Sequence, residues 1–180
     1  FWSLDVSLAY RRHFPAINWL NSYSLYLSSL RPWFDEHLGV EFMEHRDKAM
    51  HMLQQESDLQ EIVQLVGKDA LSPGDQLTLE VARMLREDFL QQNAFMDVDS
   101  YTGFDRQERM LSMILRYDEL AREAIAQGVQ IDAILELPVR TSIAQTKYEE
   151  PDAWQTAFDG IDRELAEQMR QLTEKAGEDE

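Results

Sequence analysis

The chain has 180 residues, 44% hydrophobic and 10% aromatic, which excludes intrinsic disorder and allows one domain with a core, or one domain plus part of another. Its 34 acidic residues against 17 basic ones give a formal charge of −17, which argues against nucleic acid and anionic membranes and favours solubility or a basic protein partner. The absence of cysteine excludes disulfides, zinc–thiolate sites and a cysteine nucleophile, and no apolar run is long enough to span a bilayer.

The first residues form an apolar stretch without an initiator methionine or a basic signal-peptide region, so we expect a chain that starts inside a fold. Residues 1–4 are predicted to end a buried strand, and residues 7–12 to form a short helix. Pro15 excludes a continuous helix at that point and favours an extended Phe14. A helix is then predicted to resume near Ser24 or Pro32 and to stop before Gly39.

Residues 40–56 are strong helix formers with an irregular apolar stripe. Ser57 is predicted to cap a new helix that ends at Gly67. Ser72 is the expected N-cap of the following helix, with proline in its first turn and an acid that suits the positive helix end. Residues 58–90 are therefore predicted to form a helical hairpin with a short, exposed polar tip.

The hairpin is expected to be rigid because each of its helices has an apolar face. The packing that we predict is between two groups of side chains, one on each helix: Leu59, Ile62 and Val66 against Val81, Met84 and Leu85.

The stretch 89–101, FLQQNAFMDVDSY, connects this hairpin to the next helix. Its polar residues 91–93 interrupt the apolar repeat and leave Phe95 and Tyr101 on a loop. Loops held by rigid helices often carry binding residues. Two interpretations are open from these residues alone: aromatic side chains that fill the core, or aromatic side chains that bind a ligand.

Two long helices are predicted beyond this loop. The first covers residues 105–127 and ends at Gly128, with a short apolar patch at 131–137 after it. The second covers residues 152–175, and its apolar side chains recur every three or four residues in one stripe, which indicates a core face. The fold is predicted to be mainly α, a bundle of roughly five or six helices.

Catalytic and metal-binding patterns are not found. The chain has no glycine-rich GxxxxGK[ST] phosphate loop. Glu41, Glu44 and His45 suggest a di-iron carboxylate site, but such a site needs a Glu-x-x-His on each of two helices, and the sequence has none. We therefore predict no catalytic residue and no metal site in this chain.

Three stretches agree in order and spacing with one family: HFPAINWLNSYSLY (13–26), LQEIVQLVGKDALSPGDQLTLEVARMLREDFLQQNAF (59–95) and DVDSY (97–101). Together they resemble the C-terminal part of the catalytic A subunit of vacuolar- and archaeal-type rotary ATPases. The resemblance is specific over residues 1–104 and rests on a helical extension of similar character from 104 to 180.

The resemblance implies a C-terminal helical bundle domain at residues 39–180, preceded at 1–38 by the end of a nucleotide-binding α/β domain. In the whole subunit it implies ATP hydrolysis or synthesis coupled to proton or sodium transport, with ATP or ADP and Mg²⁺ as ligands. The implied partners are the non-catalytic B subunits and the central stalk, in a cytoplasmic head peripheral to the membrane. The isolated chain lacks the phosphate loop and is expected to be inactive and to carry no cofactor of its own.

The resemblance also implies an adenine-binding surface, made of Phe14 with Pro15 from the first stretch, Phe95 at the end of QQNAF, and Tyr101 six residues further on. Adenine is a flat ring, and stacking it on an aromatic side chain contributes about 1–3 kcal/mol per base. One residue departs from the family pattern, since Met96 stands where a polar side chain is expected.

The hairpin tip corresponds to the lever loop that presses on the central stalk in such enzymes. The stalk-contact residues implied in this chain are Lys68, Asp69, Ala70, Leu71, Ser72, Pro73, Gly74 and Asp75. The tip is less acidic than the family's lever loop, so we expect a contact that is steric more than electrostatic. The alternative function is a free-standing acidic helical adaptor that binds a protein partner.

Overall fold

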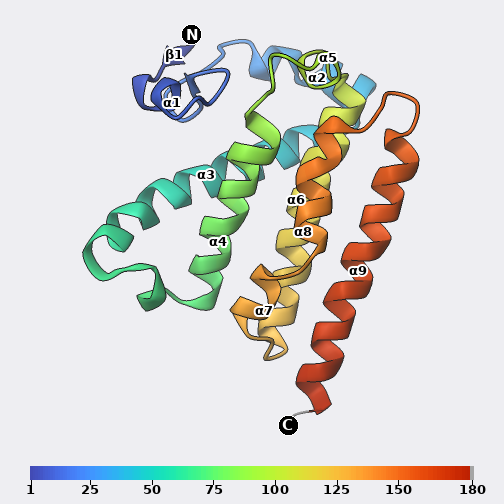
Figure 1. Cartoon of the computed structure of the whole chain (residues 1–180). Helices are drawn as coiled ribbons and strands as arrows, with labels where there is room; N and C mark the ends of the chain where they lie inside the picture. The colour runs from blue at the N-terminus through green and yellow to red at the C-terminus, as the bar shows by residue number, and fades with distance from the viewer. Residues whose placement is uncertain (179–180) are drawn as a thin grey trace.

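The computed structural model describes residues 1–178 and is mainly α-helical, as predicted (Figure 1). Within this part of the chain, five α-helices have twelve or more residues: α2 (Leu27–Leu38), α3 (Glu41–Val66), α4 (Pro73–Met84), α6 (Phe104–Ala126) and α9 (Trp154–Glu178). The predicted number of roughly five or six principal helices is therefore confirmed.

The N-terminal segment forms a small unit beside the upper end of α4 (Figure 1). Strands β1 (Ser3–Leu4) and β2 (Ile17–Asn18) pair antiparallel, and the short helix α1 (Val6–Tyr10) lies between them in the sequence. The predicted strand and helix are thus present. The prediction that the first strand is buried is wrong, because Leu4 is 80% exposed.

Helix α3 is continuous from residue 41 to residue 66, so the prediction of a new helix capped by Ser57 is wrong. No proline or glycine interrupts the run, and helix formers on both sides carry the backbone through the serine. The irregular apolar stripe is completed by a carboxylate: the buried positions of the helix are Met43, Ala49, Met52, Leu53 and Glu56. Gly67, with a φ of 85°, ends the helix as expected.

The two helices of the hairpin diverge toward the tip, and the predicted packing between them is wrong (Figure 1). Ile62 is 45% exposed and Val66 is 60% exposed, whereas Val81, Met84 and Leu85 are buried. These three side chains lie in the main core, because α4 packs on α6 as well as on α3. The far end of α3 is therefore a projecting arm held by its own backbone hydrogen bonds.

Helix α4 begins as predicted. The hydroxyl of Ser72 accepts a hydrogen bond from the backbone N–H of Asp75 at 3.1 Å and donates one to its carboxylate at 2.7 Å. At its other end α4 continues into a π-helix, η2 (Leu85–Leu90), before the chain turns into the loop at residues 91–96. This widened turn has no counterpart in the sequence-based prediction.

The core lies between α3, α4, α6 and the C-terminal helices. Met110, Ile114, Tyr117 and Ala121 of α6 are buried, as their spacing predicts. Short helices α7 (Ile131–Leu135) and α8 (Val139–Gln145) lead through the 3-10 turn η3 (Thr146–Tyr148) to α9. The α9 stripe is confirmed as a core face: Phe158, Ile161, Leu165 and Met169 are buried.

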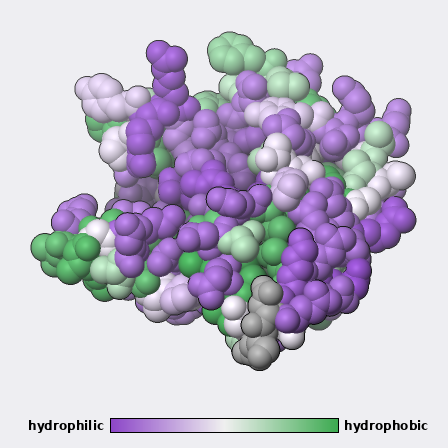
Figure 2. All heavy atoms as spheres, turned by 60° about the horizontal axis from the view of Figure 1, so that its bottom comes forward, coloured by the Kyte–Doolittle hydropathy of each residue, from purple (hydrophilic) through white to green (hydrophobic). Residues whose placement is uncertain are grey.

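The face seen from the lower end of the bundle is mostly hydrophilic, in keeping with the acidic composition (Figure 2). A hydrophobic group of atoms stands at its left edge, on the side where the far end of α3 lies in Figure 1. Leu65 and Val66, which are 85% and 60% exposed, belong to that end of the helix. Among the described helices, none combines the length and the apolar character needed to cross a membrane.

Candidate functional site

The aromatic residues predicted to contact adenine are on the surface. Phe95 is 100% exposed, Tyr101 is 84% exposed and Phe14 is 52% exposed. A side chain that fills the core is buried, so the core-filling interpretation does not describe these residues in this chain. Exposed aromatic side chains on structured loops are instead available to a ligand or to another part of a larger protein.

Two contacts to backbone carbonyls attach the Phe14 segment to η2 and to the loop that carries Phe95. The N–H of Gln92 donates to the carbonyl of Phe14 at 2.7 Å, and the imidazole Nε2 of His13 lies 2.9 Å from the carbonyl oxygen of Arg86. Residues about 75 positions apart are thereby neighbours. The structure thus brings together the backbone of the first predicted stretch and that of the second.

The loop at residues 91–96 is held by Asp99, a buried residue of the short helix α5 (Asp97–Ser100). Its carboxylate accepts a hydrogen bond from the N–H of Asn93 at 2.5 Å. The side chain of Asn93 in turn accepts one from the N–H of Phe95 at 3.1 Å, and its carbonyl accepts one from the hydroxyl of Ser100. The aromatic ring of Phe95 is therefore presented by an ordered backbone.

Tyr101 does not share a cavity with the other two aromatics in the described part of the chain. It lines a hollow of about 450 Å³ between the α5 segment and the start of α9, together with Arg106 and Trp154. Phe14 and Phe95 line none of the described hollows. The described residues, 1–178, thus present these side chains on an open surface and do not enclose an adenine pocket between them.

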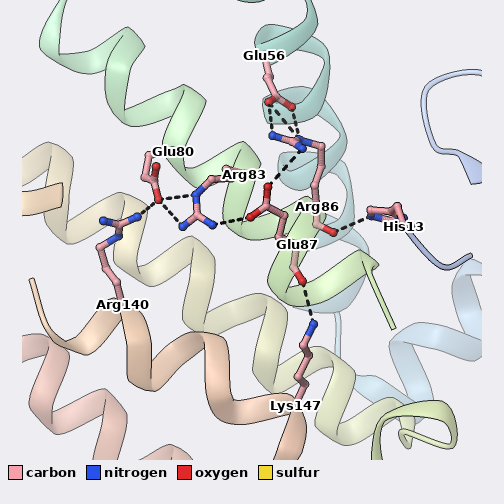
Figure 3. Close-up of polar contacts among 8 residues, drawn as sticks. All are labelled: His13, Glu56, Glu80, Arg83, Arg86, Glu87, Arg140 and Lys147. Atoms are coloured by element: carbon pink, nitrogen blue, oxygen red, sulfur yellow. Dashed lines mark hydrogen bonds and ion pairs between the residues drawn. The ribbon is translucent and has the colours of Figure 1, made fainter. Parts of the chain in front are cut away.

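The π-helix η2 leaves backbone carbonyls available to partners outside the helix. Lys147, a buried residue of η3, donates from its ammonium group to the carbonyl of Glu87 at 2.9 Å (Figure 3). It also donates to the carbonyl of Gln91 at 3.1 Å. A positive charge at the C-terminal end of a helix is stabilising. π-Helical turns of this kind occur frequently at functional sites.

A chain of ion pairs runs along η2 and α4 (Figure 3). Its members come from four elements, and the contacts connect, in order, Glu56, Arg86, Glu87, Arg83, Glu80 and Arg140. Arg86 and Glu56 have side chains only 18% and 9% exposed, so this pair is largely removed from water. The network joins the arm helix α3 to α8 through the turn that precedes the loop.

Asp88 lies on the same turn without a place in that network. Burial raises the pKa of its carboxyl group to about 6, against the attraction of Arg83 and Lys147. The carboxyl group is therefore held in surroundings that favour its neutral form below about pH 6.

These supporting residues were missed by sequence reasoning. Glu56 carries one usable signal, an acid at the position where the apolar stripe of its helix calls for a core residue. Lys147 and Asp99 carry none, because their partners are backbone groups, which every residue has. The region of the suggested di-iron site contains instead a pair in which His45 Nδ1 lies 2.9 Å from Glu108 Oε1, and the described residues contain no group of three metal-ligating side chains.

The predicted stalk-contact residues lie at the tip between α3 and α4. Lys68, Asp69 and Ala70 form the 3-10 turn η1 and are exposed. Leu71, Gly74 and Asp75 are half-buried, because the capping turn folds over the start of α4. The most exposed apolar side chain in this region is that of Leu65, on the arm just before the predicted segment.

Comparison with known proteins decides the family. The profile described as "C-terminal domain of V and A type ATP synthase" matches residues 31–135. This chain belongs to that family of C-terminal domains. The similarity found in the sequence over residues 1–104 is thereby confirmed, and it extends into the helices beyond the loop.

Similar proteins match nearly the whole chain. A V-type ATP synthase alpha chain 1 of Clostridium tetani is 53% identical over 98% of this chain. V-type ATP synthase alpha chains of Acetivibrio thermocellus and Clostridioides difficile are 50% and 49% identical over 97% and 100% of it. In each case the match covers 30% of the relative, so the chain spans about a third of the length of these curated relatives.

Proposed function

We propose that this chain is the C-terminal part of the catalytic subunit of a V/A-type rotary ATPase or ATP synthase. In the whole enzyme it closes over the adenine of the bound nucleotide and transmits force to the central stalk. Family membership supports the first statement, and similar alpha chains about three times as long provide the context. Residues 1–38 then belong to the nucleotide-binding domain and residues 39–180 to the helical domain.

The single observation that carries the adenine proposal is the contact between Gln92 and Phe14. A 2.7 Å hydrogen bond holds the backbone of the Phe14 segment against the loop of Phe95, while both rings stay exposed. A nucleotide-binding domain that supplies the phosphate site would place the base against this aromatic surface. Tyr101, which follows α5 in the chain, would contact the base at the edge of this surface.

The proposed ligands are ATP or ADP with Mg²⁺, bound by the whole subunit. This chain contains no phosphate loop, so its own contribution is contact with the base. Stacking on one aromatic ring contributes about 1–3 kcal/mol, which changes nucleotide affinity by about 5- to 150-fold without taking part in the chemistry. The proposed partners are the B subunits and the central stalk, in a head that couples ATP turnover to the transport of protons or sodium ions.

The force-transmitting part of the proposal is supported by the shape of the hairpin. The tip at residues 68–75 begins with the exposed turn η1 and follows the long helix α3, which is anchored to η2 by Glu56 (Figure 3). From the capped start of α4 to the end of η2, 18 residues at 1.5 Å rise give a separation on the order of 25 Å between tip and loop. In this proposal α4 and η2 connect the stalk contact at the tip with the nucleotide contact at the loop.

The adenine proposal is tested by Phe95→Ala in the full-length subunit, with nucleotide affinity measured by equilibrium binding. The expected loss is about 1–3 kcal/mol. Glu164→Ala, on α9 and away from the loop, is the control and is expected to retain the parent's affinity. Equal affinity of Phe95→Ala and the parent would remove Phe95 from the site.

A further inference from the structure

His13 occupies a buried position directly before Phe14 and contacts both sides of the junction. It is 8% exposed. Its ring Nε2 lies 2.9 Å from the carbonyl oxygen of Arg86, and its Nδ1 lies 3.2 Å from the carbonyl oxygen of Pro15. The backbone N–H of His13 donates to the carbonyl of Leu8 at 2.9 Å, so the backbone that carries the ring is also held.

Both ring nitrogens therefore face groups that can only accept a hydrogen bond. A neutral imidazole has one N–H and can donate to one of these carbonyls, whereas an imidazolium has two and can donate to both. The imidazolium and the neutral tautomer protonated on Nε2 both connect the Phe14–Pro15 segment to η2, because each can donate to the carbonyl of Arg86. A side chain with no donor would leave the carbonyl of Arg86 with the N–H of Gln91 as its remaining partner, 2.9 Å away.

Arg86 is itself held in place from the other direction. Its guanidinium donates to Glu56 of α3 at 2.9 to 3.2 Å, while its carbonyl faces His13 (Figure 3). Glu56 is buried, so the attachment point for His13 is fixed to the arm helix. The Phe14 segment is thus attached at two points, at Arg86 through His13 and at Gln92 through its own carbonyl.

We propose that His13 is a positioning residue for the adenine surface: its imidazole fixes the Phe14 segment to the π-helix, so that the ring of Phe14 is presented to the base. His13 does not touch the ligand and acts through Phe14. This inference rests on the proposed function, since it assumes that Phe14 contacts adenine.

The test compares two polar substitutions of His13 in the full-length subunit of the assembled complex, with MgADP as the probe. The amide nitrogen of Gln reaches the place of Nε2 and can still donate to Arg86, whereas that of Asn reaches only the place of Nδ1. His13→Asn is expected to weaken MgADP binding about 2- to 12-fold, the equivalent of one lost hydrogen bond. His13→Gln is expected to stay within about 2-fold of the parent.

The matched control is His45→Leu, which removes the contact between His45 Nδ1 and Glu108 on other helices. Melting temperatures are recorded for every variant. A residue with a purely structural role would lower the melting temperature and leave the affinity of the folded complex unchanged, as expected for His45→Leu. Equal MgADP affinity of His13→Asn and His13→Gln would overturn the proposal.

A double variant separates this inference from the function on which it rests. Phe14→Ala alone is expected to weaken MgADP binding about 5- to 150-fold, and adding His13→Asn to it should cause no further loss. A further loss in the double variant would show that His13 acts elsewhere. Parental affinity of Phe14→Ala would instead refute the adenine role of Phe14 itself.

Discussion

The guanidinium of Arg86 and the carboxylate of Glu56 form a bidentate ion pair between the π-helix and the middle of α3, with donor–acceptor distances of 2.9 to 3.2 Å. Both side chains are largely buried. Breaking a buried pair leaves one charge without its partner, which costs more than the pair itself contributes. Removing one partner of this pair should therefore destabilise the attachment of α3 by more than the net contribution of the intact pair.

We expect Glu56→Leu to lower the free energy of unfolding by about 2–4 kcal/mol, because Arg86 is left charged and largely buried. The double variant Glu56→Leu with Arg86→Met is expected to recover most of that loss, since no unpaired charge remains. Urea denaturation of the purified chain measures both. Glu119→Leu, which breaks an exposed pair with Lys48, should cost less than about 1 kcal/mol. A double variant as unstable as the sum of its single variants would contradict this.

Lys147 satisfies two carbonyls at the end of the π-helix, so Lys147→Met is expected to destabilise the chain by about 1–3 kcal/mol. The loss should be local, with faster amide hydrogen exchange at residues 91–96 than in the core helices. Lys175→Met, at an exposed position of α9, is the control and should leave exchange unchanged. Unaltered exchange at 91–96 in the Lys147 variant would show that the loop does not depend on this ammonium group.

Asp88 makes stability depend on pH. Because burial raises its pKa from 3.8 to about 6, the folded state binds the proton more tightly than the unfolded state, and this group lowers stability as pH rises from about 4 to about 6. Asp88→Asn is therefore expected to be more stable than the parent above pH 6, by about 1–3 kcal/mol, with the difference vanishing near pH 4. Denaturation at several pH values measures it.

Asp5 is the control of opposite sign. Hydrogen bonds from Ser7 and Asn18 lower the pKa of its carboxyl group to about 2. Its contribution to stability is present above the unfolded pKa of 3.8 and is lost as pH falls toward 2, so Asp5→Asn should be less stable than the parent at neutral pH. If Asp88→Asn also lost stability at neutral pH, the assignment of a partly buried carboxylate whose charged form is disfavoured would be wrong.

The lever proposal predicts a separation of effects in the assembled complex. Replacing residues 68–75 by glycines should lower torque or uncouple ATP turnover from rotation, because a flexible tip transmits less force. Single substitutions of Lys68 or Asp69 should have little effect, since both are exposed and the contact is steric. A rotation assay measures the torque of each variant. Full torque from the glycine variant would show that the hairpin tip is not needed to transmit force. Nucleotide affinity, measured in parallel, should not change.

The exposed end of α3 adds a test that the sequence did not suggest. Leu65 is 85% exposed on the arm beside the predicted tip. If the stalk contact is apolar there, Leu65→Asp should lower torque more than Asp69→Leu does. Equal torque in the two variants would confine the contact to the tip or place it elsewhere.

Regular periodicity predicted the helices well where one face meets a core. The stripes of α6 and α9 are buried as expected, since each recurs every three or four residues against an apolar neighbour. The prediction failed at α3, where Ser57 suggests an N-cap because serine is common at that position. Strong helix formers lie on both sides of Ser57, and the helix continues through it. Propensity at one residue is a weak constraint against continuous backbone hydrogen bonding.

The candidate site was predictable only in part. The residue types and order of the family stretches pointed to Phe14, Phe95 and Tyr101, and their exposure is consistent with contact outside this chain. What holds them in place depends on contacts that span 60 or more residues, such as Lys147 with Glu87 and His13 with Arg86. Local patterns carry no information on such pairs, because one partner in each is a backbone carbonyl that every residue has.

The central claim, that the Phe14 segment and the loop at 91–101 face adenine, is tested most directly by photolabelling. The full-length subunit in its complex is irradiated with an adenine nucleotide that carries an azido group on the base, and the labelled peptides are identified by mass spectrometry. The account predicts label on peptides containing Phe14 and Phe95, and its loss when excess MgATP is present. Label confined to other parts of the subunit, with these two peptides unmodified, would contradict it.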